Sequence, residues 1–163
     1  MKLIFTFLLT GLSLCAFCQD TIRTYFDAFW RPTVEQDASY YRKLYKNAQN
    51  LWVANDFYLD GQLQMQGYFS NPKTEKKTGH FTYYYANGAK ESEGEYADGY
   101  KTGPWRSWFY SNALDSEGNY ARDKKIGTWV WYHKNGQISA REIYENDKLK
   151  EFEYFDEAGV KSL

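Results

Sequence analysis

Short runs in which hydrophobic and polar positions alternate recur along this chain, each followed by a turn signal. In 137–144 one side, which is mostly apolar, carries Ile138, Ala140, Glu142 and Tyr144, and the other side carries Ser139 and Arg141. Alternation with a period of two predicts half-buried strands. The Asn-Gly pair before this run favours the positive φ angles of a tight hairpin. The pattern therefore predicts units of strand, turn, strand and turn.

These units repeat every 24 residues. Unlike positions keep the same step, which chance does not readily produce and which is the signature of a repeat architecture. The in-register positions, which we expect to be structural, are Gly79, Gly103 and Gly127; Phe81, Trp105 and Trp129; Tyr84, Trp108 and Tyr132; and Tyr96, Tyr120 and Tyr144. The turn positions Gly88, Asn112 and Gly136 keep the same register.

Copies at both ends depart from this register. An earlier copy around 57–69 lies 27 residues before the next one, and its extra residues fall in the polar stretch Asn71–Lys77. A shortened copy closes the chain, with a strand at 152–155, a turn at 156–159 and a stub at 160–161. Residues 20–50 do not fit the period, and repeat arrays need atypical ends, so this segment is expected to be a cap. We favour a strand over a helix for Ala38–Lys46, which contains Tyr40 and Tyr41.

The two faces of the predicted sheet differ in chemistry. On the apolar face, a small residue in mid-strand leaves room for a ring from the next strand. The opposite face is expected to carry an acidic strip that includes Glu91, Glu93 and Glu95. Lysines such as Lys124 and Lys125 stand at the turns between units, which predicts a basic edge.

The first residues have the form of a secretory signal. Lys2 precedes the apolar run Leu3–Leu14, which is too short to span a bilayer, and small residues precede a cleavage point after Cys18. We therefore expect a signal peptide at 1–18, a cap at 19–50 and a repeat domain at 51–163, in a protein that is periplasmic, outer-membrane-associated or secreted from a bacterium. Both cysteines fall in the signal, so the fold of the mature chain must be stabilised by packing and not by disulfides. Its near-neutral charge argues against a nucleic-acid partner.

The unit resembles a known family. Residues 127–136, in which Gly127, Trp129, Tyr132, Asn135 and Gly136 carry the pattern, look like the variant MORN repeat of many bacterial proteins. The resemblance covers residues 52–161 and implies stacked hairpins in one elongated, twisted antiparallel sheet. Some members of the family act as antitoxins, which gives one further interpretation of function. The chain departs from the pattern at Phe81, Asn112 and Glu142, which replace a Trp and two Gly.

No catalytic set emerges from the sequence. The two histidines, His80 and His133, have repeat equivalents that cannot serve as ligands, so a general base or a zinc site has little support. The acidic strip could in principle form a carboxylate pair or a calcium site, but a solvated strand face explains it more simply. We therefore expect no enzyme activity, no catalytic or metal-ligating residue and no cofactor.

Three binding functions follow from these features. The first is a scaffold in the cell envelope that binds another protein through the sheet face. The second is a glycan or cell-wall module, because exposed rings can stack on sugars. The third is docking of the lysine edge on anionic lipid. Rings that do not recur are expected to be exposed, and with the charged strips they form the candidate binding surface: Tyr83, Tyr100, Tyr110, Trp131, Glu91, Glu93, Glu95, Lys124 and Lys125.

Overall fold

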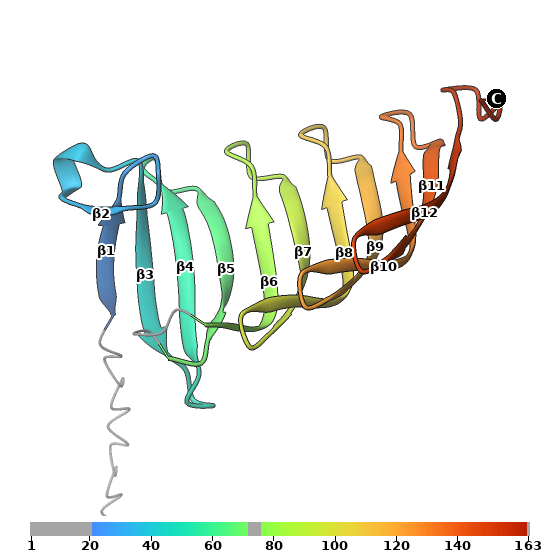
Figure 1. The fold of residues 1–163 in the computed structure, drawn as a ribbon. Helices are drawn as coiled ribbons and strands as arrows, with labels where there is room; N and C mark the ends of the chain where they lie inside the picture. The colour runs from blue at the N-terminus through green and yellow to red at the C-terminus, as the bar shows by residue number, and fades with distance from the viewer. Residues whose placement is uncertain (1–20, 72–75, 163) are drawn as a thin grey trace, which may run out of the picture.

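A computed structural model describes residues 21–71 and 76–162. The expected signal peptide lies outside the described residues, as do residues 72–75 of the polar insertion. The described chain forms one open antiparallel sheet of twelve strands in a single layer (Figure 1). From β4 onward each strand pairs with its neighbours in sequence, whereas β1 lies between β3 and β2 at one end. The all-β prediction of tandem hairpins is therefore confirmed.

Each repeat contains two strands of similar length. Their bounds are β1 (Ile22–Phe26), β2 (Pro32–Thr33), β3 (Tyr40–Lys46), β4 (Trp52–Tyr58), β5 (Leu63–Phe69), β6 (Lys77–Tyr84), β7 (Lys90–Ala97), β8 (Tyr100–Trp108), β9 (Leu114–Ala121), β10 (Lys124–Tyr132), β11 (Ile138–Glu145) and β12 (Lys148–Tyr154). One turn of 3-10 helix, η1 (Glu35–Asp37), lies between β2 and β3.

The cap is built from strands that extend the same sheet. The strand predicted within Ala38–Lys46 is confirmed as β3, which pairs with both β1 and β4. Trp30 stacks on Tyr40 with ring centroids 4.5 Å apart. At the other end, β12 begins earlier than the expected 152–155, and the expected stub forms an isolated bridge between Phe155 and Lys161.

Two kinds of turn alternate along the array. Turns inside a unit have positive φ at the predicted positions, with 81° at Gly88, 67° at Asn112 and 85° at Gly136. From β7 onward the turns between units have two residues, and both have positive φ, as at Asn146 and Asp147. Such turns match the right-handed twist of the strands they join.

Each unit-opening glycine lies inside a strand and not at a boundary. Gly79, Gly103 and Gly127 have φ between 63° and 72°. At each of them the register shifts against the preceding strand, while pairing with the following strand stays regular there. The first strand of the last full unit therefore starts at Lys124, before the expected Thr128. These bulges bend the strand and increase its twist once per repeat.

Candidate functional site

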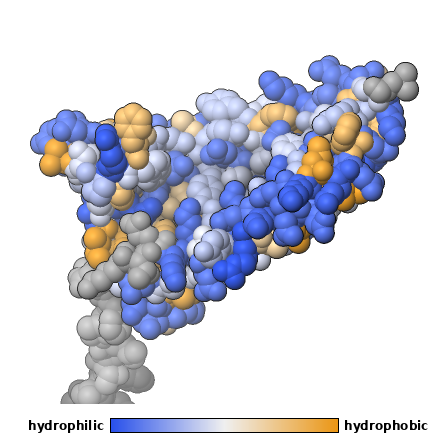
Figure 2. Space-filling model, viewed as in Figure 1, coloured by the Kyte–Doolittle hydropathy of each residue, from blue (hydrophilic) through white to orange (hydrophobic). Residues whose placement is uncertain are grey.

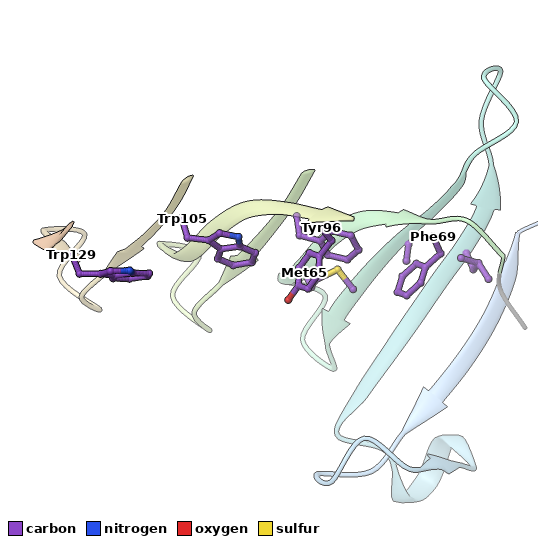
Figure 3. Close-up of a cluster of buried hydrophobic side chains, with 8 residues drawn as sticks. Met65, Phe69, Tyr96, Trp105 and Trp129 are labelled. Atoms are coloured by element: carbon purple, nitrogen blue, oxygen red, sulfur yellow. The ribbon is translucent and has the colours of Figure 1, made fainter. Parts of the chain in front are cut away.

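A row of aromatic rings runs across one face of the sheet, which we call the ring face. Strands β5, β6, β7, β8 and β10 contribute one buried ring each. With three buried aliphatic side chains these rings form the core of the described residues (Figure 3): Phe69, Phe81, Tyr96, Trp105 and Trp129, with Leu44, Ala54 and Met65. Neighbouring rings meet edge to face, with centroids 4.8 Å apart for Phe81 and Tyr96 and 5.3 Å apart for Tyr96 and Trp105. This arrangement suits the ring quadrupoles.

Mid-strand glycines make room for these rings, as the sequence predicts. A Cβ placed on Gly94 would lie 2.4 Å from the ring of Trp105, and one on Gly118 would lie 2.2 Å from the ring of Trp129. Both indoles are fixed further by hydrogen bonds: Trp105 Nε1 donates to Glu95 O at 3.2 Å, and Trp129 Nε1 donates to Asn119 O at 3.2 Å. Each ring therefore lies flat on the strand before it.

One lysine per repeat covers the rings. The Lys77 ammonium lies 4.9 Å from the ring centroid of Tyr96, that of Lys101 lies 4.2 Å from Trp105, and that of Lys125 lies 4.5 Å from Trp131. Such contacts are attractive because the ring face is electronegative. Burial lowers the pKa of Lys77 and of Lys101. The prediction of an exposed basic edge is thus wrong for these three lysines, because each has folded back over the rings, whereas Lys124 is exposed.

Arginine takes the place of lysine at the N-terminal end of the row. Arg42 lies 5.1 Å from the ring centroid of Phe69 and forms a two-point ion pair with Asp56, with nitrogen–oxygen distances of 2.6 and 2.8 Å. Asp56 is 1% exposed, so this is a buried pair. Sequence reasoning missed it because the two residues lie in the irregular first copies, where the period gives no register.

The ring face has a gap between Tyr83 and Trp131. Directly paired positions across the sheet carry Tyr83, then Ser92, Ser107 and Ser116, then Trp131. Around the three serines lies a cavity of about 220 Å³, which Lys101, Lys125, Trp105, Tyr120 and Asp115 also line. Ser107 Oγ donates to Asp115 Oδ2 at 2.8 Å and lies 2.7 Å from Ser116 Oγ.

The rings that were expected to be exposed fall into two groups. Tyr100 and Tyr110 are exposed, at 40% and 59%. Tyr83 and Trp131 were expected to be free, and this is wrong, because both pack against the core of the ring face. Trp131 Nε1 donates to Glu142 Oε2 at 2.7 Å, and the Tyr83 hydroxyl accepts from Lys77 Nζ at 2.7 Å. Burial raises the pKa of Tyr83.

Glu142, which replaces the mid-strand glycine of the last unit, ends the ring row. Its carboxylate also accepts the hydroxyls of Tyr144 at 2.9 Å and Tyr154 at 3.3 Å. Burial, with the hydrogen bond to Glu142, raises the pKa of Tyr144 to about 12. A carboxylate therefore fills the place that a ring from β12 would need.

The opposite face carries both signs of charge and not the acidic strip that was expected. Glu93 and Glu95 share this face, but His80 Nδ1 lies 3.0 Å from Glu95 Oε1 and Lys90 Nζ lies 2.7 Å from Glu93 Oε2. Arg106 pairs with Glu117 in the next unit at 3.1 Å. Glu91 lies where the register of β6 and β7 shifts, so it does not continue the alternation of Glu93 and Glu95. Figure 2 shows hydrophilic residues over much of the molecule, with hydrophobic ones scattered among them.

Aspartate side chains at the turns also hydrogen-bond to the backbone of the preceding repeat. Asp123 Oδ1 accepts from the backbone N of Lys101 at 2.6 Å, and Asp147 Oδ1 accepts from that of Lys125 at 2.6 Å. Sequence reasoning missed these partners, although the 24-residue spacing of Asp123 and Asp147 was a usable signal.

Over the described ranges, 21–71 and 76–162, no helix has the length and apolar character needed to cross a membrane. Those same ranges hold no group of three or more His, Cys, Asp or Glu side chains that could bind a metal ion. His133 forms a structural hydrogen bond between repeats, because its Nε2 donates to Phe155 O at 2.8 Å.

An open sheet of tandem hairpins, each docked only on its neighbours, defines a repeat protein of the stacked β-hairpin class. Two of its hairpins, residues 77–98 and 125–146, match the family model described as MORN repeat variant. The chain therefore carries variant MORN repeats, which confirms the resemblance seen in the sequence. The hairpin between the two matched segments, β8–β9, is the one that contains Ser107. No curated protein matches the chain.

Proposed function

We propose that this protein is an exported, non-enzymatic scaffold of the cell envelope that binds a partner protein on its ring face. MORN repeats are commonly protein- or membrane-binding modules and are generally not enzymes. The observation that carries the proposal is the row of lysines Lys77, Lys101 and Lys125, held over aromatic rings at one position in each repeat.

Charge complementarity indicates the kind of partner. In the described part of the chain, no carboxylate oxygen lies within 4.0 Å of the ammonium groups of Lys101 and Lys125. The carboxylates of the opposite face are, in contrast, largely paired with cations of that face. An acidic partner therefore gains more on the ring face, where it meets two ammonium groups that form no ion pair within 4.0 Å in the described part of the chain.

The test uses tagged protein that starts at Gln19 and native envelope extract. The double variant Lys101→Gln/Lys125→Gln removes two ring-face charges and keeps most of the side-chain stems. Its matched control, Lys124→Gln/Lys148→Gln, removes two charges from exposed lysines at neighbouring turns. We expect wild type and control to retain a stoichiometric protein that the ring-face variant loses.

Recovery of no stoichiometric protein would count against the scaffold. Equal recovery of the partner by both double variants would indicate that it binds outside the ring face. Export is checked separately, by the mass of the protein in the periplasmic fraction, which should correspond to cleavage after Cys18.

A further inference from the structure

The gap in the ring face is explained by comparing equivalent positions of successive repeats. Positions 83, 107 and 131 are equivalent, 24 residues apart, and carry Tyr, Ser and Trp. A ring therefore fills this position in the units before and after, while the middle unit has only the hydroxymethyl group of Ser107. The cavity of about 220 Å³ lies at this place. The cavity thus lies where the neighbouring units carry the rings of Tyr83 and Trp131.

The surroundings of Tyr83 show what such a ring would meet. Its hydroxyl accepts a hydrogen bond from Lys77 Nζ at 2.7 Å and lies 3.2 Å from the hydroxyl of Tyr96. The equivalents one repeat later are Lys101 and Tyr120, and both line the cavity. A phenol placed in the gap would thus find the same two polar groups that hold Tyr83.

The charge of the cavity adds a second requirement. Lys101 and Lys125 line it, and one carboxylate, that of Asp115, lines it too and accepts from Ser107 Oγ at 2.8 Å. The lysine equivalent of the preceding unit, Lys77, continues the row. A ligand that brings negative charge beside the ring is therefore favoured over a neutral one.

Resting on the proposed function, we propose that the gap at Ser107 binds a tyrosine side chain from an acidic segment of the partner protein. The ring completes the row between Tyr83 and Trp131, and acidic side chains on either side of it reach Lys77 and Lys125. The phenol hydroxyl accepts from Lys101.

The spacing of the lysines limits the form of that segment. Equivalent residues of successive units lie two strands apart, roughly 9 to 10 Å across the sheet. A polyproline II segment advances about 9 Å per turn of three residues, so every third side chain falls on one side. Acidic residues at every third position of an extended segment therefore match the row.

The test measures binding of a blocked synthetic peptide by titration calorimetry. The peptide carries one tyrosine with a glutamate three residues before it and another three residues after it, so that the three side chains fall on one side. A second peptide has alanine in place of the tyrosine. The informative variant is Ser107→Tyr, which supplies the missing ring from the protein itself. Ser107→Ala, which leaves the gap open, is its control.

We expect the tyrosine peptide to bind wild type and Ser107→Ala alike. Its affinity should fall at least about tenfold, or about 1.4 kcal/mol, for Ser107→Tyr and for the alanine peptide with wild type. Thermal unfolding of Ser107→Tyr should occur at or above the wild-type temperature, because the preceding unit accommodates Tyr83 in this position.

Three results of the binding titrations would overturn the inference. They are equal binding of the two peptides, full binding by folded Ser107→Tyr, and tight binding of an oligogalacturonate that the tyrosine peptide cannot displace, which would indicate an acidic glycan instead. Capture of the same envelope protein by wild type and Ser107→Tyr would also overturn it and yet leave the proposed scaffold function standing.

Discussion

At the scale of single residues, the packing of this protein depends on pairs in which one aromatic ring lies against one glycine. Gly67, Gly94 and Gly118 have no room for a Cβ, because a ring of the next unit lies on each of them. The single-layered sheet has no second layer to cover its rings, so it buries them against its own backbone and under lysine side chains. Glu142 shows the alternative, since a side chain at this position excludes the ring.

Gly118→Ala should destabilise the fold by about 1 to 3 kcal/mol, the usual cost of overpacking a filled site. The new methyl would lie 2.2 Å from the Trp129 ring, which its bond to Asn119 O holds in place. Denaturant unfolding measures this free energy. Asn119→Ala, an exposed change on the same strand, should stay within about 0.5 kcal/mol of wild type, and a similar value for both variants would contradict the packing argument.

At the scale of the hairpin, the 24-residue unit is regular because three backbone features recur in it. A bulge with a left-handed glycine opens the unit, a turn with one left-handed residue joins its strands, and a turn with two left-handed residues leads to the next unit. Asp123 and Asp147 then hydrogen-bond to the backbone of the unit before. Backbone geometry and these two side-chain hydrogen bonds thus fix the relation of one hairpin to the next.

Gly127→Ala isolates the backbone contribution of the bulge. Nothing lies within 4 Å of a Cβ at Gly127, where φ is 63°. The loss should therefore come from the left-handed conformation alone, about 1 to 2 kcal/mol by chemical denaturation. Gly127→Asn should cost less, because asparagine tolerates this region. Equal losses for the two variants would indicate that the bulge depends on something other than φ.

At the scale of the whole molecule, the sheet is a one-dimensional array. Each strand contacts the strands beside it, and within residues 21–71 and 76–162 no element packs across the faces (Figure 1). Stability in such an array is approximately a sum of unit and interface terms, so damage should stay local.

Trp129→Ala should therefore unfold mainly the C-terminal end. Removal of a buried indole costs about 3 to 5 kcal/mol, and Trp129 is 4% exposed. Hydrogen exchange with mass spectrometry should show lost protection in β10–β12 and retained protection in β4–β6. Phe69→Ala, a buried ring near the other end, should show the reverse, and a uniform loss in either variant would contradict the array.

The sequence alone determined the class of fold, the unit length, the hairpin turns and the rings that recur in register. Each of these is local or periodic: alternation sets a strand, a positive-φ residue sets a turn, and a repeated step implies a repeated environment. For the same reason Phe81, Trp105 and Trp129 could be assigned to the core, and the mid-strand glycine could be read as space for a ring.

Only the tertiary structure decided which side chains are free to bind. Lys77, Lys101 and Lys125 were expected at an edge, but their long chains reach back over neighbouring rings, and sequence spacing does not encode that direction. Tyr83 and Trp131 did not recur in the middle unit and so seemed exposed, although both pack on the ring face. The irregularity that matters is Ser107 between them, and its meaning depends on cross-strand pairing, which places three serines side by side.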